Sequence, residues 1–163
     1  MERLMPTSQH FKQQKKIGRW FEAECEKLLL AKGMEVVDSE NLSYRQKKGW
    51  DREVSINGAR SKVEMKYDQL SEQTGNVCLE LSAIRQSISP IWLYGLPEGS
   101  TVDVYAMYLC DLAPFVESYP VRRFVGEFNV QAVLVPKWQF LGQEFVKKFS
   151  SIQALQPKLL TTK

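Results

Sequence analysis

The sequence lacks the features of several protein classes. No apolar run approaches the roughly 18–20 residues that a membrane-spanning helix needs, so we expect no membrane association. Residues 1–19 are polar and basic and have no apolar segment typical of a secretory signal, which favours a cytoplasmic location. Cys25, Cys78 and Cys110 are far apart and form no Cys-x-x-Cys pair, so they predict buried thiols rather than disulfides or a zinc site. His10 is the single histidine, which excludes a histidine-rich metal centre.

The composition is that of an ordinary globular protein. Of the 163 residues, 44% are apolar and 25% are charged, and this length suits one domain with one substantial core. We expect a basic N-terminal arm over residues 1–16, a single domain over residues 17–156 and a C-terminal tail over residues 157–163.

The net charge of +3 is modest, but the cations are clustered near two points of the sequence. Such clusters suit contacts with nucleic-acid phosphates, whose affinity comes largely from counterion release. They are equally typical of a solvated surface, and charge alone leaves both interpretations open. The candidate nucleic-acid-binding residues are Lys12, Lys15, Lys16, Arg19, Lys47 and Lys48.

Apolar spacing predicts a helix, several strands and a final helix. The first helical pattern covers residues 17–32 and ends at Gly33, which suits a left-handed cap. The last helical pattern covers residues 136–152 and begins at Pro136. Between them we expect extended segments at 34–37, 77–81, 91–94, 102–109 and 130–135, and a short helix at 111–117. This order predicts an α/β or α+β domain in which helices flank a mixed central sheet.

Residues 50–67 contain the most informative pattern. Asn57-Gly58 is the strongest short signal for a two-residue type I′ hairpin turn. In that hairpin Ile56 faces Ala59, and the same register places Asp51 directly opposite Glu64, with Cβ atoms roughly 4.5–5.5 Å apart. Lys66 shares the face of Glu64. The other face would be directed at the core and carry Trp50, Val54, Ile56, Ala59, Val63 and Met65.

This register would place two carboxylates and one ammonium on the solvent side of the hairpin. Opposed like charges destabilise a strand pair, so Asp51 and Glu64 invite a cation between them. Mg²⁺ prefers such oxygen ligands, and the backbone carbonyl of Met65 is a candidate third ligand. Lys66 could then position a water or stabilise developing charge.

Plainer interpretations of the same residues remain open. A Glu-x-Lys pair is common on exposed strands. A slip in register would place Asp51 opposite Arg60 or Lys62 instead of Glu64. Glu80, on the strand at 77–81, is more typical of an exposed strand glutamate than of a neighbour of the metal site.

The pattern Asp51…Val63-Glu64-Met65-Lys66, with an upstream glutamate on a helix, resembles the PD-(D/E)XK phosphodiesterase superfamily. The segment from Gly18 to Glu22 is similar to the N-terminal helix of its small phage and bacterial members and of Holliday junction resolvases. Glu22 matches the glutamate that reaches the metal site there. Glu24 and Glu26 are competitors, of which Glu26 shares the side of Glu22. Trp50 stands where the superfamily has its proline.

The resemblance implies a restriction-endonuclease-like core and a metal-dependent nuclease. Its catalytic residues would be Glu22, Asp51, Glu64 and Lys66, and its metal ligands Asp51, Glu64, the Met65 carbonyl and Glu22. The cofactor would be Mg²⁺, for which Mn²⁺ can substitute. The partner would be DNA, cut by an endonuclease. Structure-specific cutting, as by junction resolvases, and a homodimer with two active sites are both compatible with this resemblance. Two alternatives stay open: an inactive nucleic-acid-binding module on the same fold, and an RNA-directed nuclease.

Overall fold

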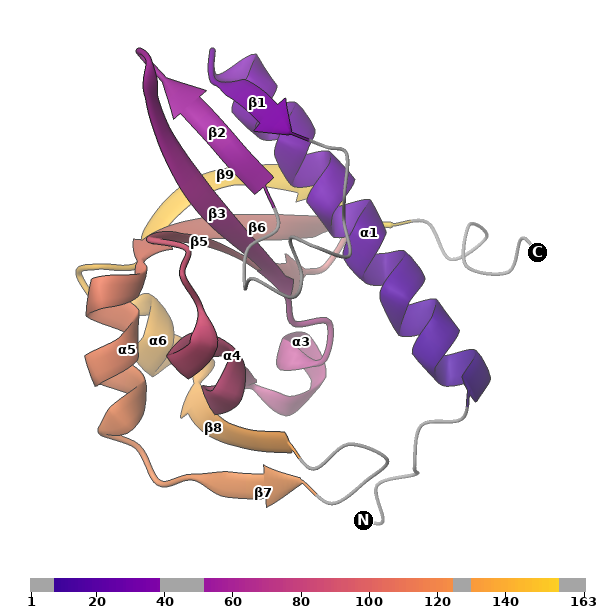
Figure 1. Cartoon of the computed structure of the whole chain (residues 1–163). Coiled ribbons are helices and arrows are strands. Elements are labelled where there is room, and N and C mark those ends of the chain that lie inside the picture. Colours follow the sequence, from indigo (N-terminus) through magenta and orange to yellow (C-terminus); the bar gives the residue numbers. More distant parts are fainter. Residues whose placement is uncertain (1–7, 39–51, 125–129, 156–163) are drawn as a thin grey trace.

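The protein has a mixed α/β architecture built around a curled six-stranded sheet (Figure 1). The structure is a computed structural model that describes residues 8–38, 52–124 and 130–155, with side chains described for residues 15–36, 52–123 and 130–155. A long helix crosses one face of the sheet, and short helices and a second, three-stranded sheet cover the other. None of the described helices combines the length and apolarity that crossing a bilayer requires.

The six-stranded sheet is mixed because one neighbouring pair of strands is parallel. Its order is β1-β2-β3-β5-β6-β9, and β3 pairs with β5 in parallel while the other neighbours are antiparallel. The strands are β1 Glu35–Asp38, β2 Arg52–Ile56, β3 Ala59–Tyr67, β5 Ile91–Glu98, β6 Thr101–Tyr108 and β9 Lys147–Gln153.

The second sheet is antiparallel and has the order β4-β8-β7. In the chain, β4 lies between β3 and β5, whereas β7 and β8 lie between β6 and β9. Its strands are β4 Asn76–Glu80, β8 Val130–Pro136 and β7 Arg122–Phe124. The helices are α1 Ser8–Ala31, α3 Ser71–Thr74, α4 Leu81–Gln86, α5 Leu109–Glu117 and α6 Lys137–Leu141.

Two apolar clusters lie on the two faces of the large sheet. On the α1 face, Phe21, Cys25 and Leu29 of the helix pack against buried strand residues such as Val63 and Leu93. On the other face, Trp92 and Tyr94 of β5 join the apolar residues of β4, β8, α5 and α6. Burial on both sides explains why β5 is continuously buried from Trp92 to Pro97 rather than alternating.

Gly95 of β5 allows α1 to pack closely on the sheet. A Cβ atom at Gly95 of β5 would lie only 2.6 Å from Cζ of Phe21 and 3.1 Å from Cδ2 of Tyr67. The Phe21 ring occupies this notch and stacks on Tyr67, with ring centroids 5.3 Å apart. Because Glu22 follows Phe21 directly, this contact also fixes where Glu22 enters the structure.

The hairpin prediction is confirmed. Asn57 and Gly58 have φ values of 51° and 84°, as a type I′ turn requires. Ile56 pairs with Ala59, and the predicted register holds to Arg52 opposite Val63. Ile56 is 40% exposed and Ala59 is also exposed, because the tip of the hairpin extends beyond the core.

The predicted segments at 34–37, 77–81, 91–94, 102–109 and 130–135 correspond to β1, β4, β5, β6 and β8. Helix α1 begins at Ser8, so residues 8–16 of the expected arm belong to it. All three cysteines are free, but the expectation that all are buried is wrong, because Cys110 is exposed.

The predicted helix over residues 136–152 is wrong. Helix α6 ends at Leu141, and residues 147–153 form β9 along the edge of β6. The apolar residues at helical spacing divide between the two elements: Ile152 pairs with Val102 in the ladder, and Phe149 packs on the α1 face of the sheet. Hydrogen bonds to the free edge of β6 therefore outweighed a local pattern that also fitted a helix.

Candidate active site

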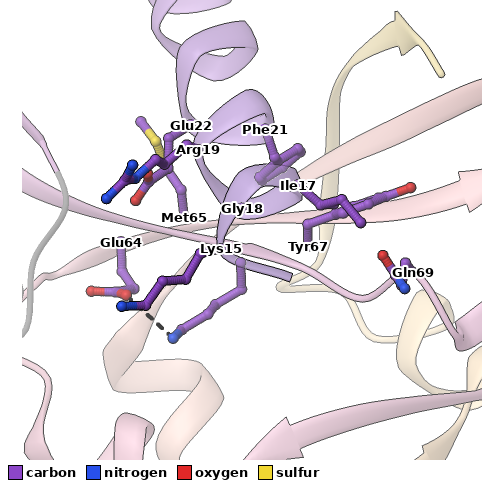
Figure 2. Close-up of a pocket in the computed structure, with 11 residues that line it drawn as sticks. Lys15, Ile17, Gly18, Arg19, Phe21, Glu22, Glu64, Met65, Tyr67 and Gln69 are labelled. Atoms are coloured by element: carbon purple, nitrogen blue, oxygen red, sulfur yellow. Dashed lines mark ion pairs between the residues drawn. The ribbon is translucent and has the colours of Figure 1, made fainter. Parts of the chain in front are cut away.

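A cavity of about 380 Å³ lies between α1 and the second half of β3 (Figure 2). The charged side chains at its wall come from two elements that are distant in sequence. The lining residues are Lys15, Ile17, Gly18, Arg19, Phe21 and Glu22 of α1, then Glu64, Met65, Lys66 and Tyr67 of β3, and Gln69. Three of the four predicted catalytic residues thus line one cavity.

The hairpin register explains why β3 reaches the cavity. Among the described residues, the pairing of β2 with β3 ends at Arg52 opposite Val63. Beyond Val63, β3 continues to pair with β5 in parallel, with Glu64 opposite Trp92 and Lys66 opposite Tyr94. Helix α1 packs against β3 and brings its own polar residues to the same place.

Glu64 and Lys66 share one face of β3, as predicted, but that face is not the solvent side. Their partners Trp92 and Tyr94 are buried in the second apolar cluster, and Glu64 is only 8% exposed. The Lys66 Nζ atom lies 3.6 Å from Oε1 of Glu64. The expectation of a solvated face fails because the small sheet and its helices cover this side of the large one.

Glu22 comes from the opposite side of β3. It is 9% exposed and belongs to the helix that covers the face of Met65, which is itself buried. Figure 2 shows Glu22 near Met65 and Arg19, with Glu64 across the strand. Two largely buried carboxylates from different secondary-structure elements therefore line the same cavity.

The cations near the carboxylates belong mainly to α1. Lys15 and Arg19 line the cavity, and Figure 2 shows Lys15 pointing toward the Glu64 carboxylate. Lys16, another predicted nucleic-acid-binding residue, is exposed on the same helix. Lys12 lies within α1, but its side chain is outside the described part. Lys47 and Lys48 lie outside the described residues.

Asp51, the fourth predicted catalytic residue, also lies outside the described residues, as does Trp50. Its pairing with Glu64 and its role as a metal ligand stay predictions. The register that motivated them is confirmed up to the neighbouring Arg52.

The structure also shows a partner for Glu26 that the sequence analysis missed. Arg52 is 8% exposed, and its Nε donates to Oε2 of Glu26 at 3.1 Å. The alternation of β2 places Arg52 on the face of Val54, toward α1, which was the available signal. Glu24 instead forms an ion pair with Lys27 on the helix surface. Of the three glutamates, Glu22 is the one that lines the cavity.

A second cavity of about 270 Å³ adjoins the first and shares Lys66, Tyr67 and Gln69 with it. Its other lining residues are Asp68, Leu70, Cys78, Glu80, Trp92, Tyr94 and Val130. Glu80 is partly buried here, so it is not the plainly exposed strand residue that its pattern suggested.

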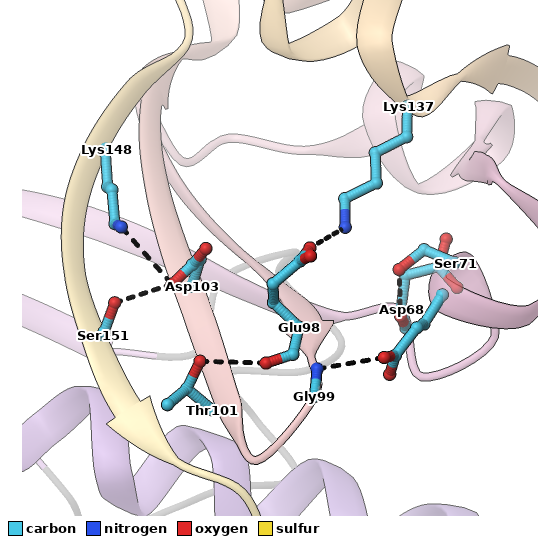
Figure 3. Close-up of polar contacts among 10 residues, drawn as sticks. Asp68, Ser71, Glu98, Gly99, Thr101, Asp103, Lys137, Lys148 and Ser151 are labelled. Atoms are coloured by element: carbon cyan, nitrogen blue, oxygen red, sulfur yellow. Dashed lines mark hydrogen bonds and ion pairs between the residues drawn. The ribbon is translucent and has the colours of Figure 1, made fainter.

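Asp68 organises the loop between the two cavities. Its carboxylate accepts hydrogen bonds from the backbone N–H of Cys78 at 2.7 Å and of Leu70 at 3.2 Å. Its carbonyl accepts from the Ser71 hydroxyl at 3.0 Å (Figure 3). Burial raises the pKa of the Asp68 carboxyl, and the backbone hydrogen bonds oppose that shift.

Tyr94 closes the floor of the second cavity. Its hydroxyl donates to the Cys78 carbonyl at 2.7 Å. Burial raises the pKa of Tyr94 well above its usual value, so the phenol stays protonated and the bond to β4 is kept.

No group of three or more His, Cys, Asp or Glu side chains able to hold a metal ion occurs in the described ranges. The described part of the site therefore offers two carboxylates, Glu22 and Glu64, rather than a complete cage. No family model matches the chain, and neither a curated protein nor a solved structure matches it significantly.

Proposed function

We propose that the protein is a Mg²⁺-dependent nuclease that hydrolyses phosphodiester bonds of DNA on a restriction-endonuclease-like core. The observation that carries the proposal is the convergence of Glu22, Glu64 and Lys66 on one cavity, beside Lys15 and Arg19. Carboxylates and cations that are gathered in a cleft at a cost in desolvation mark a functional site more often than a packing site.

The donor set suits a hard divalent cation. Mg²⁺ usually takes one or two carboxylates and completes its octahedron with water and substrate phosphate. Glu64 and Glu22 supply the two carboxylates, and the Met65 carbonyl and Asp51 are the further ligands that the resemblance implies. When bound, Mg²⁺ lowers the pKa of a water and stabilises the charge on phosphate oxygens.

The chain's own cations support the reaction around that centre. Lys66 Nζ, held 3.6 Å from Oε1 of Glu64, is placed to donate to the attacking water or to a non-bridging phosphate oxygen. Lys15 and Arg19 supply positive charge for the phosphate backbone on the α1 side. Donors fixed in a partly water-excluded cavity need little reorganisation as negative charge develops.

The direct test is an assay on matched DNA and RNA substrates: duplex, nicked duplex, four-way junction and single strand. We expect cleavage of DNA with Mg²⁺ or Mn²⁺ and none in excess EDTA. Lys66→Ala and Glu64→Gln should each lower the cleavage rate by about 100-fold or more, the typical loss for a group that stabilises transition-state charge. Both variants should bind DNA with an affinity close to that of the unmodified protein.

Lys62→Ala is the matched control, because Lys62 lies on the same face of β3, two residues before Glu64. It should cleave at nearly the unmodified rate. Full activity in EDTA, or in both site variants, would contradict the proposal. DNA binding without cleavage would favour an inactive binding module, and cleavage restricted to RNA would favour an RNA-directed nuclease.

A further inference from the structure

The second cavity is too small for a double helix, yet it opens beside the candidate catalytic residues. Its volume of about 270 Å³ lies just below the roughly 300–1,000 Å³ found for small-molecule pockets. Lys66, Tyr67 and Gln69 line both cavities, so a group in the second is a direct neighbour of a phosphate in the first. This size and position suit a single nucleotide of the strand that is being cut.

The lining of this cavity suits a nucleobase better than a phosphate. Trp92 and Tyr94 give it buried aromatic surface, whereas Asp68 and Glu80 give it two carboxylates. The carboxylates would repel a phosphate but accept hydrogen bonds from the amino groups of adenine, cytosine or guanine. A base can enter such a cavity only when it is unpaired and unstacked.

The small sheet places a cation next to this cavity. Glu80 of β4 pairs with Ala132 of β8, and Ala132 pairs with Arg122 of β7. The three residues form one row on one face of the sheet, so the Cβ atoms of Glu80 and Arg122 lie roughly 10 Å apart, two strand spacings. Val130, on the same face, lines the cavity itself. Arg122 is exposed and well placed for the backbone of an entering strand.

We propose that the second cavity binds the base of one unpaired nucleotide next to the scissile phosphate, and that Arg122 contacts the backbone of the same strand. The proposal rests on the proposed nuclease function and specifies its substrate class. That class is DNA with unpaired nucleotides at the cut, such as a flap, a bulge or a frayed junction.

The test is fluorescence anisotropy in EDTA, which measures binding without cleavage. The two probes are a labelled duplex with an unpaired flap and a fully paired duplex of equal length. The unmodified protein should bind the flap duplex about 10-fold more tightly, a difference of about 1.4 kcal/mol. Val130→Phe fills the cavity from its rim and should abolish this preference. Cys78→Leu is a second filling variant.

Two matched controls lie in the same sheet. Leu134→Phe changes a partly buried residue on the same face of β8, outside the cavity, and should keep the preference. Arg122→Gln should weaken binding of the flap duplex several-fold, whereas Arg123→Gln, on the opposite face of β7, should not.

Equal binding of both probes by the unmodified protein would overturn the proposal. So would a preference that survives Val130→Phe and Cys78→Leu in folded protein. A preference that both variants abolish supports the pocket. Should this occur without metal-dependent cleavage of any substrate, the base pocket would stand and the proposed nuclease activity would fail.

Discussion

The two ends of the contact between α1 and the sheet differ sharply in chemistry. Near its N-terminal half, α1 and β3 enclose the charged cavity with Glu22, Glu64 and Lys66. Near its C-terminal end, Leu29 and Val63 belong to a cavity of about 290 Å³ whose lining is almost entirely apolar. Val63 and Glu64 are adjacent residues of one strand, but Val63 packs in the apolar cluster on the α1 face, whereas Glu64 points to the face of Trp92.

The charged end of this contact contributes less to the stability of the fold than the apolar end. Apolar residues at the C-terminal end bury surface at a gain of about 25 cal/mol per Å². The charged groups at the other end lose hydration, which pairing restores only in part. Departures from a consistent apolar core are expected at functional sites, and the charged cavity at the N-terminal end of the contact is such a departure.

The first prediction separates two glutamates one turn apart on α1. Glu22→Gln should lower the cleavage rate by about 10- to 100-fold, equivalent to about 1.4–2.7 kcal/mol in activation free energy. Glu26→Gln removes the charged partner of the buried Arg52 and should cost about 1 kcal/mol of stability, while cleavage stays normal. Steady-state cleavage and urea unfolding measure both, and exchanged phenotypes would refute the assignment.

The second prediction concerns the contact between Gly95 of β5 and the Phe21 ring of α1, which lies between the charged and the apolar cavity. Gly95→Ala forces a Cβ into the ring of Phe21 and should lower the free energy of unfolding by about 1–3 kcal/mol, as overpacking does. Cleavage should fall as well, because Glu22 moves with Phe21. Gly18→Ala is the control: nothing lies within 4 Å of its Cβ position, and an alanine within a helix should stabilise by about 0.5–1 kcal/mol. Equal stability of the two variants would contradict this packing.

The third prediction tests whether the apolar cavity serves only packing. Ala106→Val adds two methyl groups from β6 into it and should raise the free energy of unfolding by about 0.5–1 kcal/mol. The cleavage rate should not change. A several-fold change in rate would show that the two ends are coupled.

The smallest expected effect is a pH dependence that comes from Asp68. Burial raises the pKa of this carboxyl above its ordinary value of 3.8, so the folded state holds the proton more tightly than the unfolded state. Its contribution to stability is therefore present below pH 3.8 and is lost as the pH rises through the higher folded pKa. Asp68→Asn should be less stable throughout, because an amide accepts from one backbone N–H rather than two, but its stability should fall less steeply above that pH. Urea unfolding between about pH 4 and pH 7 measures the slope, and equal slopes would contradict the assignment.

Local signals predicted the part of the site that depends on the hairpin. Asn57 and Gly58 set the turn, the turn set the register, and the period of two placed Glu64 and Lys66 on one face. The same reasoning could not show that this face is covered, because β4, β8 and β7 come together through long-range pairing. Apolar spacing also could not distinguish a long C-terminal helix from α6 followed by β9, since Phe149 and Ile152 fit both.

The sequence by itself determined the hairpin, its register and the acid and lysine of β3, because turn preference and side-chain alternation act within a few residues. Only the tertiary structure decided that Glu22 and Lys15 line one cavity with Glu64, that Arg52 is paired with Glu26, and that Glu80 adjoins the site. These juxtapositions depend on the packing of Phe21 against Gly95 and on the packing of the small sheet. Such contacts join residues that are far apart in the sequence, so they form only when the core as a whole assembles.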